Sequence, residues 1–175
     1  MVCEKLYPNY LYFQSRCNWG DSSVLLGAIE IMYQSLFKSV FFDDEEIEQC
    51  IYAVDAVTPD TEGFLDSSVS LALDACTAVY SSLNFMHDQE VDHIIAVAIY
   101  ARDTVYMSII NKDGLDMNLK GIDAMVLDDP LMIKEIARQF SIIEELESLK
   151  DENISDELIQ RHKAGPAIID LKTLK

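Results

Sequence analysis

Residues 67–110, SSVSLALDACTAVYSSLNFMHDQEVDHIIAVAIYARDTVYMSII, decide the fold. Over 67–86 the apolar residues recur three or four positions apart, which is the spacing of one face of an α-helix. These residues are Val69, Ala72, Leu73, Cys76, Val79, Leu83 and Met86. The same spacing continues over 89–110, where it is set by Val91, Ile94, Ile95, Ala98 and Val105. We therefore expect two long helices at the centre of the protein.

The second of these segments contains an unbroken apolar run, 94–101, which by itself also suits a buried strand. The run lies within a long stretch free of glycine and proline, and this favours a helix buried on most sides. Lys112-Asp113-Gly114 is expected to end this helix, with Gly114 in the position of a C-cap.

Shorter helices are expected around this pair. Asp21 is a candidate N-cap for a helix over 21–40, and the acids of 43–46 suit the start of a second helix that ends before Pro59. Asp128-Asp129-Pro130 is typical of a helix start. The inward face of the helix that follows is predicted to comprise Ile133, Ile136, Ala137, Phe140 and Ile143.

One more short helix is expected over 155–165, where Gly165-Pro166 would end it. The chain of 175 residues has the length of one domain. The sequence thus predicts an all-α fold, a single-domain bundle of about six helices over residues 1–175.

The charge balance is strongly acidic. Thirteen Lys and Arg against 31 Asp and Glu give a net charge of −18. Such a surface repels phosphate backbones and anionic lipids, so we expect no nucleic acid and no membrane partner. A basic protein partner is compatible with this charge, although solubility alone also explains it. Four scattered cysteines without metal-binding spacing, and no visible signal peptide, predict a cytoplasmic protein.

The N-terminal segment 3–10, CEKLYPNY, with the turn Gly20-Asp21, resembles the YjaG-like family of uncharacterised bacterial helical proteins, domain of unknown function 416. Residues 73–76, LDAC, resemble a segment on the central helix of that family. The resemblance implies a helical domain without an established activity. In that family a full helix precedes the motif, so the resemblance also implies that this N-terminal helix is shortened or missing here.

A missing helix would leave an apolar groove, which favours self-association. We therefore expect a homo-oligomer, a homodimer in the simplest case, with Tyr7, Tyr10 and Trp19 as candidate interface residues. The alternative is that these aromatic residues wedge a helix turn against the core.

His87, Glu90 and His93 are the candidate metal ligands. Glu90 and His93 have the i, i+3 spacing of carboxylate-bridged di-metal bundles, where both side chains share one helix face. Such sites need a second Glu-x-x-His, and the sequence has none. Solvent-facing residues near a helix start are the alternative interpretation.

Asp74 and Arg102 interrupt the two most apolar segments. An unpaired buried charge is costly, so the sequence predicts an internal ion pair between them that sets helix register.

Phosphate-binding loops, dinucleotide fingerprints and the serine nucleophile elbow are absent from the sequence. We expect a non-enzymatic protein that self-associates or binds a protein partner and requires no cofactor. The alternative is a metal-binding bundle or metal-dependent enzyme that uses His87, Glu90 and His93.

Overall fold

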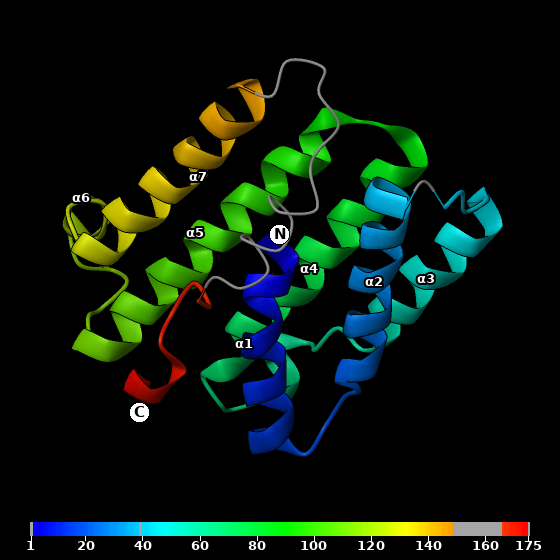
Figure 1. The fold of residues 1–175 in the computed structure, drawn as a ribbon. Coiled ribbons are helices and arrows are strands. Elements are labelled where there is room, and N and C mark those ends of the chain that lie inside the picture. Colours follow the sequence, from blue (N-terminus) through cyan, green and yellow to red (C-terminus); the bar gives the residue numbers. More distant parts are fainter. Residues whose placement is uncertain (1, 39, 149–165, 175) are drawn as a thin grey trace.

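The computed structural model describes residues 2–38, 40–148 and 166–174, and these residues form helices without a β-strand (Figure 1). The helices are α1 Val2–Cys17, α2 Ser22–Lys38, α3 Asp44–Ala56, α4 Ser68–Asp88, α5 Val91–Asp113, α6 Ile122–Leu127 and α7 Pro130–Ser148, with 3₁₀ turns at Thr61–Gly63 and Leu171–Thr173. The all-α fold class is confirmed. The helix expected over 155–165 lies outside the described residues.

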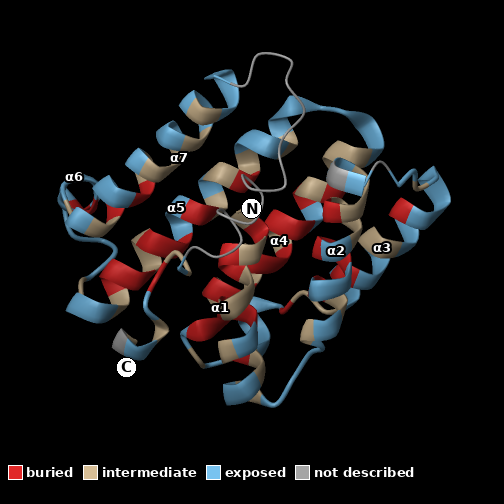
Figure 2. Cartoon of the chain, in the orientation of Figure 1, coloured by how far each residue is buried: buried red, intermediate tan, exposed pale blue. Residues whose placement is uncertain are grey.

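Helix α4 lies at the centre of the bundle and packs against α1, α2, α3 and α5. Its apolar residues are buried along most of its length, as the helical spacing of 67–86 predicts (Figure 2). The run 94–101 lies inside α5, so the helical interpretation of this run is confirmed.

The predicted helix ends are close to the observed ones. Asp43 and Glu46 form a capping box at the start of α3, in which each side chain accepts a hydrogen bond from the other's backbone N–H. Gly114 ends α5 with a φ of +62°, and the Asp129 carboxylate accepts a hydrogen bond from the Leu131 N–H in the first turn of α7.

The YPNY motif lies within α1, not after a helix, and Pro8 stands inside that helix. Proline lacks the N–H that would bond to the Glu4 carbonyl, but its φ is helical, so a well-packed helix tolerates it. One face of α1 buries Leu6, Tyr10 and Phe13 against α4. The motif therefore belongs to the core.

By length and composition alone, α5 is the one described helix that is able to cross a membrane. Core helices of water-soluble proteins meet the same criteria. α5 carries exposed Arg102 and Asp103 near its middle, and it packs along α4.

A second, smaller core cluster joins the start of α4 to α5, α6, α7 and the segment after residue 165. Its buried members are Leu71, Val105, Ile109, Ile110, Ile122, Val126, Met132 and Ile169. Figure 1 shows α7 running antiparallel to α5, which brings the start of α7 to the end of α5. This arrangement holds α7 on the outside of the bundle with only one face covered.

Candidate functional site

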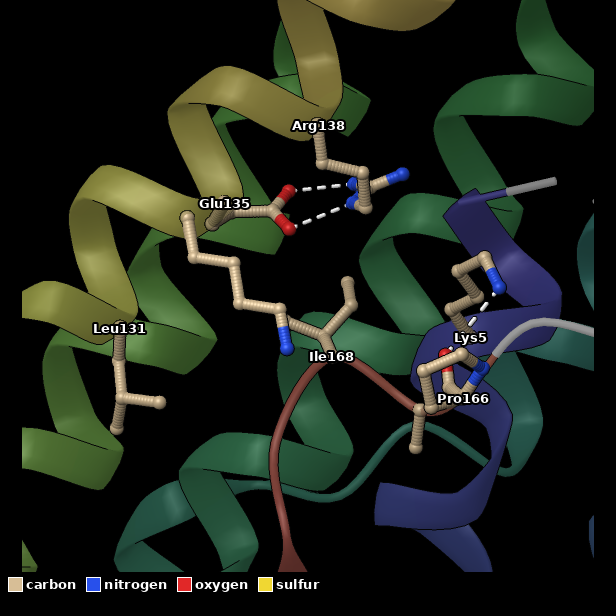
Figure 3. Close-up of a pocket in the computed structure, with 8 residues that line it drawn as sticks. Lys5, Leu131, Glu135, Arg138, Pro166 and Ile168 are labelled. Carbon is tan, nitrogen blue, oxygen red and sulfur yellow. Dashed lines mark hydrogen bonds and ion pairs between the residues drawn. The ribbon is translucent and has the colours of Figure 1, made fainter.

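A pocket with a concentration of positive charge lies where α1, α7 and the segment 166–168 meet (Figure 3). Lys5 comes from α1, and Lys134, Glu135 and Arg138 come from α7. Three cations and one carboxylate leave an excess of two positive charges among the lining residues. In a chain of net charge −18, this local excess stands out.

Glu135 is the centre of a buried polar network on the inner side of α7. Its side chain is 4% exposed, and its two oxygens accept hydrogen bonds from Arg138 Nε and Nη2. Gln139 Nε2 donates to Glu135 Oε1 and to the Ala98 carbonyl on α5, both at 2.9 Å. The network therefore ties α7 to α5 through polar groups.

Two cationic groups in the pocket keep unused donors. Lys5 is only 7% exposed, and its Nζ donates a hydrogen bond to the Pro166 carbonyl at 3.2 Å. Burial and the neighbouring Arg138 charge both lower the pKa of Lys5. Arg138 Nη1 is buried and has no hydrogen-bond partner among the described residues.

The outer side of α7 is apolar, contrary to the predicted orientation of this helix. Ile133, Phe140 and Ile143 are exposed, and Phe140 has 63% of its surface open to solvent. Met132 and Glu135 are buried instead. The predicted inward face is wrong for Ile133, Ala137, Phe140 and Ile143, because the Glu135 network and Met132 occupy the side of α7 that faces the bundle. Ile136 is half-buried at the edge of this side and packs against the second core cluster, as predicted. We call Ile133, Ile136, Phe140 and Ile143 the α7 stripe.

The candidate metal ligands do not converge. His87 at the end of α4 lies 3.7 Å from Glu48 on α3, whereas His93 in α5 lies 3.0 Å from Asp88. Glu90 is the N-cap residue of α5 and makes no side-chain cap bond. Within the described ranges, no three His, Cys, Asp or Glu side chains are close enough to share a metal ion.

The predicted ion pair between Asp74 and Arg102 does not form. Asp74 Oδ2 accepts a hydrogen bond from Thr104 Oγ1 at 2.8 Å, and Arg102 is exposed. Thr104 Oγ1 in turn accepts from Asn9 Nδ2 at 3.4 Å, so a polar chain links α1, α5 and α4. Burial raises the pKa of Asp74 to about 7. The hydrogen-bond partner of Asp74 is therefore a neutral hydroxyl and not the predicted cation.

The three candidate interface residues have different environments. Tyr10 is fully buried, and its hydroxyl donates to the Val57 carbonyl at 2.7 Å, so the prediction that it contacts a partner is wrong. Tyr7 is partly buried against the core. Trp19 packs edge-on against Phe13 and Phe64, with ring centroids 6.0 Å and 5.3 Å apart. Tyr10 and Tyr7 therefore belong with the core, whereas Trp19 is 37% exposed and covers the edge of the core.

The residues of the basic pocket carry little signal in the sequence. Glu135 and Arg138 have i, i+3 spacing, which indicates a helix-surface ion pair and not a buried one. Lys5 lies far from both residues in the sequence. The packing of α1 and the segment 166–168 beside α7 brings Lys5 into the same pocket as Glu135 and Arg138.

Comparison with known proteins places the chain among proteins of one family. The family model described as "Protein of unknown function (DUF416)" matches residues 1–164. The uncharacterized protein YjaG of Escherichia coli K12 is 25% identical over 169 residues, which cover 93% of this chain and 80% of that protein. YjaG of Salmonella typhimurium LT2 is 27% identical over the same shares.

A solved structure agrees with the fold. The crystal structure of a DUF416 family protein from Shewanella baltica OS155 superimposes with a TM-score of 0.77 at 26% sequence identity. The match covers 91% of this chain and 80% of that chain.

Proposed function

We propose that this chain, which belongs to the DUF416 family, is a non-enzymatic module that pairs with a second copy of itself through the α7 stripe. The observation that carries the proposal is the orientation of α7, which turns the Glu135 network and Met132 toward the bundle and leaves Ile133, Phe140 and Ile143 exposed to solvent, with Ile136 half-buried between them. Fully burying one such apolar side chain stabilises a complex by roughly 1.5–3 kcal/mol before the costs of association.

The spacing of the α7 stripe suits a twofold-symmetric contact. Its four residues are separated by three, four and three positions, so the pattern reads the same in both directions about position 138. Two copies of α7 packed antiparallel would place Ile133 opposite Ile143, and Ile136 opposite Phe140. A twofold interface uses the same patch on both subunits, and such a pattern is self-complementary.

Helix α5 extends the apolar surface beside α7. Ile94, Ile95 and Ile99 are exposed in its first half. The Gln139–Ala98 hydrogen bond and the antiparallel course of the two helices bring this half of α5 beside the second half of α7 (Figure 1). Exposed apolar residues also lie elsewhere on the described surface, for example Leu26 and Leu36 on α2, and Phe41 beside Val40 in the segment before α3.

Substitution of Phe140 by glutamate tests this interface. Because both subunits lose a central apolar anchor and gain a charge, we expect the dissociation constant of Phe140→Glu to rise roughly 100-fold or more. Phe41→Glu is the matched control, since Phe41 is 88% exposed and lies between α2 and α3. Sedimentation velocity over a range of protein concentrations measures the dissociation constants of the wild type and of the two variants. A wild-type chain that stays monomeric at high concentration, or equal behaviour of the two variants, contradicts the proposal.

The salt dependence of association distinguishes a second copy from a basic partner. Two chains of charge −18 repel each other, so screening by added NaCl should strengthen the dimer. Contact with a basic protein would weaken under the same change. We expect the dimer dissociation constant to fall between 50 mM and 500 mM NaCl; a rise in this constant would argue against a self-paired apolar interface.

A further inference from the structure

We infer that the pocket formed by Lys5, Lys134 and Arg138 binds a small phosphate group, as an inorganic ion or as part of a metabolite. The cavity measures about 80 Å³, several times the roughly 10–15 Å³ that one water molecule needs. This space suits a single oxyanion. The inference is independent of pairing through the α7 stripe, because Lys5 and the segment 166–168 lie on the inner side of α7.

The pocket supplies donors that lack acceptors. Arg138 uses Nε and Nη2 on Glu135, while its buried Nη1 has no hydrogen-bond partner in the described part of the chain. The Lys5 ammonium carries three N–H groups, of which one bonds to the Pro166 carbonyl. Buried donors without acceptors are costly, and a tetrahedral oxyanion between the two cations would satisfy several of them at once.

The charge of the pocket favours a dianion. The lining residues carry two positive charges in excess, which matches a phosphate group near pH 7 better than a carboxylate of single charge. Figure 3 shows the Arg138 and Lys5 side chains at separate edges of the pocket, with Ile168 below Arg138 and Glu135 bonded to the Arg138 guanidinium. Glu135 thus orients the cation.

The acidic surface of the protein limits what reaches this pocket. A net charge of −18 repels long polyanions over their whole length. A single small phosphate experiences this repulsion at one point only, and inside the pocket the nearby cations outweigh it. Small phosphorylated molecules therefore fit, whereas nucleic acids do not.

The structural alternative is a clamp, in which Lys5 and Arg138 serve only to tie α1 and the segment 166–168 to α7. Both interpretations predict that loss of Lys5 weakens the fold. They differ at Lys134, which lines the pocket, is exposed, and makes no hydrogen bond or ion pair with the residues that the structure describes. A clamp does not need Lys134, whereas a phosphate site does.

Calorimetric titration with sodium phosphate at constant ionic strength tests the site, with sodium chloride and sodium acetate as separate arms. We expect wild-type binding of phosphate, at least tenfold weaker binding by Lys5→Met, and a several-fold loss in Lys134→Ala. Lys172→Ala is the matched control, because Lys172 is exposed and lies outside the pocket lining.

Three results would overturn the inference: no phosphate binding by the wild-type chain, equal heats with chloride, or unchanged affinity in Lys134→Ala. Tighter binding of acetate than of phosphate would assign the pocket to carboxylates and overturn the phosphate preference. Lys134→Ala changes an exposed side chain and should fold normally. Its phosphate affinity therefore tests the site even if Lys5→Met does not fold. Phe140→Glu should bind phosphate like the wild type, so failure of pairing and failure of phosphate binding remain distinguishable.

Discussion

Gly20→Ala is expected to lower the free energy of unfolding by roughly 2–4 kcal/mol. Gly20 has a φ of +84°, a left-handed conformation that costs a residue with a Cβ roughly 1–2 kcal/mol. In addition, a Cβ at this position would lie 2.2 Å from Tyr10 Oη. Tyr10 must then move, and its 2.7 Å hydrogen bond to the Val57 carbonyl is lost. Urea unfolding followed by circular dichroism measures the difference.

The chain offers a control that separates these two causes. Gly114 also has positive φ, but an added Cβ there would meet no atom within 4 Å. Gly114→Ala should therefore cost only the backbone strain. In a double-mutant cycle, Tyr10→Phe removes the hydroxyl that the new Cβ meets, so Gly20→Ala should cost less in that background. Equal losses of unfolding free energy in Gly20→Ala and Gly114→Ala would show that the contact between the new Cβ and Tyr10 adds no cost.

Asp74→Asn is expected to stabilise the protein increasingly as pH rises. Burial raises the pKa of Asp74 to about 7, above the value near 3.9 of an unfolded aspartate. The unfolded chain therefore releases this proton first, and the stability that the group contributes at low pH is lost as pH climbs from about 4 to about 7. Asparagine does not titrate, and its carbonyl still accepts from Thr104.

The difference in unfolding free energy between Asp74→Asn and the wild type should grow by roughly 2–3 kcal/mol between about pH 5 and pH 8. This figure is an upper bound, because Asp74 keeps some contact with solvent. Other carboxylates cancel in this difference, which urea unfolding at each pH provides. Asp103→Asn is the comparison variant: burial also raises the pKa of Asp103, but this side chain is more exposed and the Arg102 charge opposes the shift, so the corresponding difference should grow less. A constant difference across this pH range would show that Asp74 has an ordinary pKa.

Local sequence signals account for most of the helices. Periodic apolar residues predict α4 and α5, and the acids of 43–46 predict the start of α3, where a capping box forms. These signals act within one or two helical turns, so no tertiary information is needed to interpret them. α1 is harder to predict because Pro8 argues against a helix interior, and its packing on α4 outweighs that local preference.

The candidate site depends on tertiary packing and is therefore much less predictable. The apolar spacing of Ile133, Phe140 and Ile143 correctly indicates a helix with one apolar face, but an apolar face serves equally against a core or against another subunit. Only the buried Glu135 network shows which face turns inward. Similarly, the expected pairing of Asp74 with Arg102 follows from charge alone, whereas the rotation of α5 presents Thr104 to Asp74.

The most direct test of the proposed pairing is chemical cross-linking at the centre of the α7 stripe. Ala137 is exposed beside position 138, about which the stripe is symmetric, so two Ala137→Cys side chains should approach each other across the twofold axis. The background carries Cys17→Ser and Cys50→Ser, which leaves only the buried Cys3 and Cys76. A short bis-maleimide should convert Ala137→Cys into a covalent dimer. Ala53→Cys, exposed on α3, should remain monomeric. Failure of Ala137→Cys to cross-link, or equal cross-linking at both positions, would contradict antiparallel pairing through α7.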